Sequence, residues 1–209
     1  PEYHELAIWQ DEAVLHFDCA DSYITLLEKL TALLGRQPEL PDWVYDGVIL
    51  GIQGGTEVCQ KKLDVMREHG VKVSGIWAQD WEGRRVTSFG KRLMWNWRWD
   101  SELYPELDKR IPQWKKEGVR FLGYINPYVA IEKELYAEAA EKGYLTKDYN
   151  GEDYQVEFGE FYAGVVDLTK PEAYDWYKNV IKKNLIEFGL DGWMADFGEY
   201  LPTDTVLHN

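Results

Sequence analysis

Residues 46–80 read DGVILGIQGGTEVCQKKLDVMREHGVKVSGIWAQD, and this stretch decides the fold class. An apolar run at 46–52 leads through a glycine-rich loop to a helical pattern at 56–69, and a second apolar run follows at 71–78. Apolar runs of this length, separated by a helix, are typical of parallel strands that are buried on both faces. The stretch therefore predicts one β/α unit followed by the strand of the next.

The same order of elements continues toward the C-terminus. The further predicted elements are helix 104–117, strand 119–125, helix 131–142, an insert at 143–168, helix 171–188 and strand 190–195. Strands that alternate with helices indicate either a doubly wound sheet or a (β/α)8 barrel, and four strands fit half of such a barrel.

A different pattern precedes residue 41. Residues 5–18 alternate loosely between apolar and polar side chains, which predicts a strand. Asp21 or Ser22 can cap a helix that ends near Gly35, and the proline-containing sequence QPELPDW at 37–43 predicts a stiff connector. We interpret this part as the end of a preceding domain.

Composition narrows the class of protein. The net charge of −14 argues against a nucleic-acid partner, which needs a basic face. No apolar run reaches the ~20 residues of a membrane span, and the first residues lack the pattern of a signal peptide. Two isolated cysteines favour a reducing compartment, so we expect a cytoplasmic protein. Because the chain starts at Pro1 without an initiator methionine, we expect it to be a fragment.

The few histidines and cysteines argue against a metal centre. The four histidines are scattered, and the two cysteines lie 40 positions apart, with no spacing typical of metal ligands. The sequence predicts neither a bound metal nor another cofactor.

Polar side chains follow the predicted strands where each strand ends. They are Gln53, Gln79 with Asp80, Asn126, and Asp196. Barrel enzymes place their active sites at the carboxyl ends of the strands, which favours the barrel over the doubly wound sheet.

Asp196 is the candidate nucleophile. It follows the fourth predicted strand directly, and a carboxylate there can attack the anomeric carbon of a glycoside if a second carboxylic acid protonates the leaving oxygen. A capping role for Asp196 is equally compatible with its position. Glu199 lies three residues further on, and we favour a supporting role for it.

The segment at 80–100 is rich in tryptophan and arginine, which suggests a loop that contacts a ligand. Arg92 and Trp95 are three residues apart, so one helical turn would place the guanidinium and the indole N–H on the same side, where both can donate to one anion. The alternative is that Arg92 pairs with an acidic residue and Trp95 fills the core.

Taken together, the motifs resemble glycoside hydrolase family 31, and within it the enzymes that cleave α-sulfoquinovosides. The motifs that carry the resemblance are LLGRQPELPDW (33–43), ILGIQGG (49–55), GIWAQDW (75–81), KRLMWNW (91–97), YINPYV (124–129) and WMADFGEYLPTD (193–204). The resemblance implies a retaining α-glycosidase with Asp196 as the nucleophile, acting on sulfoquinovosyl glycerol or its diacyl lipid.

Four positions carry the resemblance to the enzymes that cleave α-sulfoquinovosides. The resemblance implies that Arg92 and Trp95 bind the sulfonate, and that Gln53 and Gln79 serve the sugar hydroxyls and the contacts beside the sulfonate. Neutral-sugar members usually have Asp in place of Gln79. A carboxylate there would repel a sulfonate, whereas a neutral amide still forms hydrogen bonds.

The resemblance also implies a division of the chain. Residues 1–40 would be the end of an N-terminal β-sandwich domain with a linker helix, and residues 41–209 the first four β/α units of the (β/α)8 barrel. The acid/base residue of the family lies on a later strand, so we expect the fragment alone to be inactive. The rest of the barrel or another chain is needed to cover the two sheet edges.

Two alternatives stay open. One is an enzyme of the same family that acts on a neutral α-glucoside or α-xyloside. The other is a non-catalytic carbohydrate-binding fragment.

Overall fold

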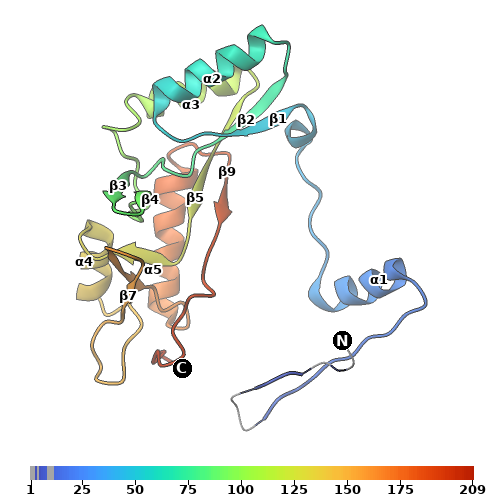
Figure 1. Cartoon of the computed structure of the whole chain (residues 1–209), viewed down its shortest axis with the longest axis vertical. Helices are drawn as coiled ribbons and strands as arrows, with labels where there is room; N and C mark the ends of the chain where they lie inside the picture. Colours follow the sequence, from blue (N-terminus) through green and yellow to red (C-terminus); the bar gives the residue numbers. More distant parts are fainter. Residues whose placement is uncertain (1–2, 4, 9–11) are drawn as a thin grey trace. The chain divides into compact units, whose positions relative to one another are not determined.

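The structure is a computed structural model, and it describes residues 3, 5–8 and 12–209 (Figure 1). The chain divides into two compact units, Pro1–Leu40 and Pro41–Asn209.

The first unit contains the helix α1 (Tyr23–Leu34). Ser22 caps it, as expected, because its Oγ accepts a hydrogen bond from the backbone N–H of Thr25 at 3.1 Å. The predicted strand at 5–18 was wrong for its described residues 5–8 and 12–18, which form no strand. A strand needs a hydrogen-bonded neighbour, and none pairs with these described residues. Residues 9–11 of that prediction lie outside the described part.

The second unit is built on a parallel sheet with the strand order β1-β2-β5-β9. Its strands are β1 (Val48–Gly51), β2 (Val73–Trp77), β5 (Arg120–Ile125) and β9 (Gly192–Ala195). The four predicted strands are thus confirmed, each slightly shorter than expected. All three neighbouring pairs are parallel, so the carboxyl ends of the strands lie at one edge of the sheet.

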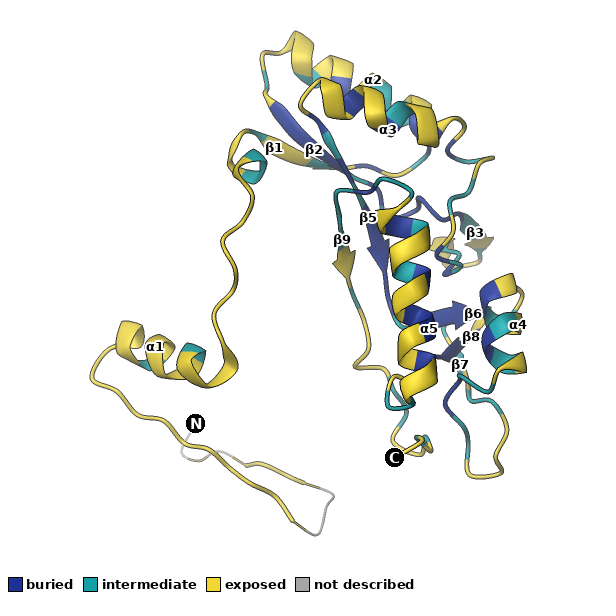
Figure 2. Cartoon of the chain, turned by 180° about the vertical axis from the view of Figure 1, so that it is seen from behind, coloured by how far each residue is buried: buried dark blue, intermediate teal, exposed yellow. Residues whose placement is uncertain are grey.

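Helices connect these strands. They are α2 (Thr56–Glu68), α3 (Leu107–Lys116), α4 (Glu134–Glu141) and α5 (Pro171–Ile181), with a short 3-10 helix η1 (Asp42–Tyr45) before β1. The predicted helix at 171–188 continues beyond α5 as the π-helical turn η2 (Lys182–Ile186), which the sequence pattern did not indicate. Figures 1 and 2 show α2 and α3 beside one another along β1 and β2.

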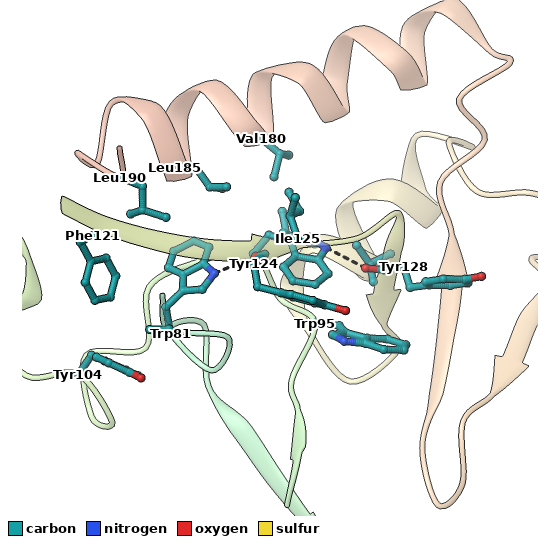
Figure 3. Close-up of a cluster of buried hydrophobic side chains, with 14 of the residues drawn as sticks. Trp81, Trp95, Tyr104, Phe121, Tyr124, Ile125, Tyr128, Val180, Leu185 and Leu190 are labelled. Carbon is teal, nitrogen blue, oxygen red and sulfur yellow. Dashed lines mark hydrogen bonds between the residues drawn. The ribbon is translucent and has the colours of Figure 1, made fainter. Parts of the chain in front are cut away.

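Aromatic side chains form much of the core around β5 (Figure 3). Val180, Leu185 and Leu190 lie on one side of this strand, and the large rings lie on the other. Two tryptophan rings form hydrogen bonds with the backbone of β5 and of β6 (Tyr128–Ala130). The indole N–H of Trp81 donates to the carbonyl of Tyr124 at 2.9 Å, and that of Trp97 donates to the carbonyl of Tyr128 at 2.8 Å. These two tryptophans therefore have a structural role.

Two small antiparallel sheets accompany the main sheet. The segment at 80–100 forms a hairpin of β3 (Arg84–Thr87) and β4 (Gly90–Leu93). The insert at 143–168 contributes β7 (Gln155–Glu157) and β8 (Tyr162–Val165), which join β6 (Tyr128–Ala130) in the order β6-β8-β7. Both small sheets are therefore formed by chain segments that follow β2 and β5.

The main sheet is open. Among the described residues, β1 and β9 each have one strand neighbour, and the described chain does not close a barrel. Apolar residues on these edge strands are correspondingly exposed, including Val48 at 44% and Met194 at 43% (Figure 2).

Candidate active site

One cavity of about 310 Å³ lies at the carboxyl ends of the parallel strands. It is lined by the five side chains that the sequence assigns to catalysis or substrate binding, namely Gln53, Gln79, Arg92, Trp95 and Asp196. Because the strands are parallel, Gln53 after β1, Gln79 after β2 and Asp196 after β9 reach the same edge of the sheet. The hairpin brings the other two residues to it.

The two glutamines are held by each other. Nε2 of Gln53 donates to Oε1 of Gln79 at 2.7 Å. This bond orients both amides and leaves one acceptor oxygen on Gln53 and N–H donors on Gln79 for a ligand. The adjacent strands β1 and β2 set the pair, since their registered ends place the two residues side by side.

Asp80 has a structural role at the same edge. It is fully buried, and its carboxylate accepts hydrogen bonds from the backbone N–H of Gly54 at 2.9 Å and from the hydroxyl of Tyr104. Burial raises the pKa of Asp80, and these two hydrogen bonds oppose that effect. Asp80 thereby fixes the loop after β1. In the same loop Gly55 has φ of 105° and lies so close to Leu103 that a Cβ would come within 2.2 Å of its carbonyl oxygen, so this position requires glycine.

Asn126 is also structural. Its Oδ1 accepts a hydrogen bond from the backbone N–H of Tyr128 at 2.9 Å, which shapes the turn between β5 and β6. It does not belong to the cavity lining.

Arg92 and Trp95 reach the cavity from the hairpin, but the helical turn expected between them was wrong. Arg92 lies in β4, opposite Arg85 of β3, and Trp95 follows the strand with φ of 58°. The hydrogen bonds of the hairpin hold this segment extended. Among the described residues no acidic side chain lies within 4.0 Å of the Arg92 guanidinium, so Arg92 remains available to an anion.

Trp95 is enclosed by other rings and lacks one polar contact. It stacks on Tyr128 with the ring centres 5.4 Å apart, and Phe158 and Phe161 meet it edge to face. Trp95 is only 5% exposed, and its indole Nε1 has no hydrogen-bond partner among the described residues. Because a buried N–H rarely lacks a partner, this group is a candidate donor to a ligand that enters the cavity.

The buried carboxyl group of Glu82 holds the backbone that follows β4. The sequence did not indicate this role. It is 2% exposed, and its Oε2 accepts a hydrogen bond from the backbone N–H of Asn96 at 3.1 Å. Burial raises the pKa of Glu82 to about 8, although the backbone N–H groups of residues 94–96 act in the opposite direction. A left-handed backbone costs roughly 1–2 kcal/mol for a residue with a side chain, so this contact helps to stabilise the conformation at Trp95.

Asp196 is anchored by β5. Its backbone N–H donates to the carbonyl of Ile125 at 2.9 Å, and the hydroxyl of Tyr124 donates to its Oδ2 at 2.8 Å. Burial raises the pKa of Tyr124 above its usual value, with the hydrogen bond to Asp196 acting in the same direction, so the phenol remains a donor. Sequence reasoning missed Tyr124, although it lies two residues before the strand-end Asn126 and therefore on the same face of β5.

The cavity combines one carboxylate with cationic and aromatic walls. Within the described part of the chain, Asp196 is the one carboxylate in the lining, and Glu199 is absent from it. Lys91 and Arg92 add positive charge on the hairpin side, in a chain whose net charge is −14. Phe158, Phe161 and Phe197 complete an apolar wall. Such a site suits a small anionic molecule with an apolar face.

Two further properties concern the described residues alone. No cluster of three or more His, Cys, Asp or Glu side chains among them could hold a metal ion. None of the described helices combines the length and the hydropathy needed to cross a membrane.

A parallel α/β sheet with its site at the carboxyl ends of the strands is typical of α/β enzyme domains, both barrels and doubly wound sheets. The family model for the glycosyl hydrolases family 31 TIM-barrel domain matches residues 38–208. The chain belongs to this family.

Curated relatives are similar to most or all of this chain. A sulfoquinovosidase of Escherichia coli (strain K12) is 76% identical over 209 residues, and one of Agrobacterium fabrum is 46% identical over the same length. Both matches cover 100% of this chain but 31% of the relative, so the chain spans about a third of the curated relatives. An alpha-xylosidase of Lactiplantibacillus pentosus is 29% identical over 190 residues.

Solved structures agree on the fold. A GH31 family sulfoquinovosidase from E. rectale, in complex with the aza-sugar inhibitor IFGSQ, has a TM-score of 0.87 and 56% sequence identity. That match covers 91% of this chain and 29% of the solved chain. A dextranase of Flavobacterium johnsoniae, at 20% identity and a TM-score of 0.74, shares the fold.

Proposed function

We propose that this chain is part of a retaining α-glycosidase that hydrolyses α-sulfoquinovosides such as sulfoquinovosyl glycerol. The observation that carries the proposal is the cavity, whose lining brings together Asp196, Arg92 and Trp95, the last with a buried indole N–H that has no partner among the described residues. Two relatives named sulfoquinovosidases, aligned over the whole chain, support the choice of substrate.

Asp196 is the nucleophile in this proposal. One carboxylate oxygen forms a bond to the anomeric carbon while the bond from that carbon to the aglycone oxygen breaks. The leaving oxygen takes a proton from a carboxylic acid of the complete enzyme that lies outside this chain. Water then releases the sugar from the glycosyl-aspartate ester, and the same acid, now a base, accepts its proton.

Arg92 of the hairpin and Trp95 just after it bind the sulfonate. Arg92 donates to its oxygens from a planar fork of N–H groups, and Trp95 donates from its indole Nε1. Gln53 and Gln79 serve the sugar hydroxyls and the contacts beside the sulfonate. A neutral amide at Gln79, in place of a carboxylate, avoids repulsion of the anion.

The complete enzyme would extend the described fold. In this proposal residues 41–209 are the first four β/α units of a (β/α)8 barrel, and residues 1–40 end an N-terminal β-sandwich domain with its linker helix. The rest of the barrel covers the exposed edges at β1 and β9. The two free cysteines fit a reducing compartment, and we place the enzyme in the cytoplasm.

Replacement of the nucleophile tests the proposal. In the complete enzyme, Asp196→Asn keeps the shape of the side chain but removes the attacking charge, so we expect turnover of an aryl α-sulfoquinovoside to fall at least about 10⁴-fold. Binding of a sulfoquinovose-like inhibitor, measured by calorimetry, should persist. Near-normal turnover by Asp196→Asn would overturn the assignment.

A further inference from the structure

Tyr124 makes the one side-chain hydrogen bond to Asp196 within the described part of the chain, and it does so from a fixed position. Its ring is 1% exposed and packs at 6.1 Å, centre to centre, from the ring of Trp97. Its carbonyl accepts the indole N–H of Trp81 at 2.9 Å, and its register partner in β9 is Met194. The phenol therefore has little freedom to leave the carboxylate.

The bond engages only one of the two carboxylate oxygens. Oδ2 accepts the phenol at 2.8 Å, whereas no described residue donates to Oδ1. A carboxylate held at one oxygen cannot rotate freely, so the other oxygen keeps a constant direction. A donor at this place also stabilises the ionised form over the protonated form.

We infer that Tyr124 is a positioning residue: its hydroxyl holds Oδ2 of Asp196 so that Oδ1 attacks the sugar, and it stabilises the carboxylate that departs in the second step. The inference rests on the proposed function. In the first step Oδ1 bonds to the anomeric carbon, and Oδ2 becomes the carbonyl oxygen of the ester. In the second step water attacks that carbon, the bond from the carbon to Oδ1 breaks, and the returning negative charge is shared with Oδ2, to which Tyr124 donates.

Several other charged or titratable groups lie near this pair. Arg84, Lys91 and Arg92 line the same cavity, the buried Glu82 lies near Tyr124, and Glu199 and Tyr200 lie near Tyr128. A variant at Tyr124 leaves all of them in place, so a change in the pH profile reports on the phenol itself.

The test is Tyr124→Phe in the complete enzyme, with the pH dependence of kcat/KM for an aryl α-sulfoquinovoside as the deciding measurement. We expect the acidic limb of the profile to move to higher pH, because the ionised carboxylate has lost a donor, and kcat to fall about 10- to 100-fold. KM should fall together with kcat, since release of the sugar from the ester becomes slow.

The matched control is Tyr104→Phe, which also removes a buried hydrogen bond from a tyrosine to an aspartate, here Asp80, outside the cavity lining. Its acidic limb should stay where it is in the parent enzyme. An acidic limb for Tyr124→Phe that coincides with the parent's would overturn the inference.

A second substitution at position 124 and the Asp196→Asn variant complete the test. If Tyr124→Phe does not fold, 3-fluorotyrosine at position 124 keeps the ring and strengthens the donor, so the acidic limb should move to lower pH; an unmoved limb counts against the inference. Asp196→Asn separates the two proposals. If that variant is inactive and the Tyr124 variants leave the limb unmoved, the positioning role alone fails, whereas an active Asp196→Asn removes the proposed function itself.

Discussion

Arg92 is a cation without an acidic partner among the described residues. The free energy that it contributes to ligand binding depends on the charge of the ligand. No described acidic side chain pairs with Arg92, and the residue is exposed. An anionic substrate gains charge-assisted hydrogen bonds there, whereas a neutral substrate gains nothing comparable. Selectivity between sulfonated and neutral sugars is therefore a property that one substitution can test.

In the complete enzyme, we expect Arg92→Ala to lower kcat/KM for an aryl α-sulfoquinovoside about 100-fold or more, from the loss of charge-assisted bonds worth roughly 1.5–3 kcal/mol each. Activity on an aryl α-glucoside should not fall. Arg98→Ala is the control, since Arg98 follows the same hairpin but points to Glu138 instead of the cavity. Equal losses on both substrates would favour the neutral-sugar alternative.

The buried carboxyl group of Glu82 makes the stability of the protein depend on pH. Its pKa is raised to about 8 mainly by burial, so its protonated form stabilises the fold fully below pH 4.5 and this contribution is lost as the pH rises through about 8. Glu82→Gln mimics the neutral carboxyl at every pH. We expect the melting temperature of the parent to drop relative to that of Glu82→Gln between pH 5 and pH 9.

The exposed Glu141→Gln serves as the control for this comparison, because both of its forms are solvated. A difference in melting temperature between parent and Glu82→Gln that stays constant over this pH range would contradict the prediction.

At the scale of elements, the sequence predicted the parallel strands and their helices because buried apolar runs and amphipathic helices have clear periods. Strand-end residues such as Gln53 and Asp196 followed, since the end of a parallel strand fixes their place. The hairpin was missed because short antiparallel strands with many charges, such as GKRL at 90–93, resemble loops. The helical turn assumed for Arg92 and Trp95 failed for this reason.

Other parts of the site lie beyond any local pattern. Phe158 comes from the insert, far along the chain from the strands, and reaches Trp95 only through the tertiary fold. The contact between Glu82 and the backbone at Asn96 depends on a left-handed conformation that no residue preference for tryptophan would indicate. The π-helical turn after α5 is a further local feature without a sequence signal.

In the molecule as a whole, the described cavity contains one of the two carboxyl groups that a retaining glycosidase uses. A retaining enzyme uses two carboxyl groups about 5–5.5 Å apart, and Asp196 is the one carboxylate that the described lining provides. The open sheet agrees with this, because the strands that would carry a partner acid have no counterpart among the described strands.

We therefore expect the 209-residue segment, expressed alone, to show no turnover of an aryl α-sulfoquinovoside under conditions in which the complete enzyme is active. The exposed edges at β1 and β9 should also make the segment aggregate, which light scattering can measure. Turnover by the purified segment that disappears in its own Asp196→Asn variant would contradict the prediction.

The separation of the hairpin from the parallel strands has a consequence for how such enzymes diverge. In the proposed mechanism, bond cleavage relies on Asp196 at a strand end and on Tyr124 of β5, while discrimination by charge relies on β4 and the residues just after it. Exchange of this short connection for another of similar length can redirect the enzyme to a differently charged sugar without disturbing the reacting atoms. Descendants of one scaffold can thus acquire new substrates by changing a surface insertion while they inherit the cleavage step intact.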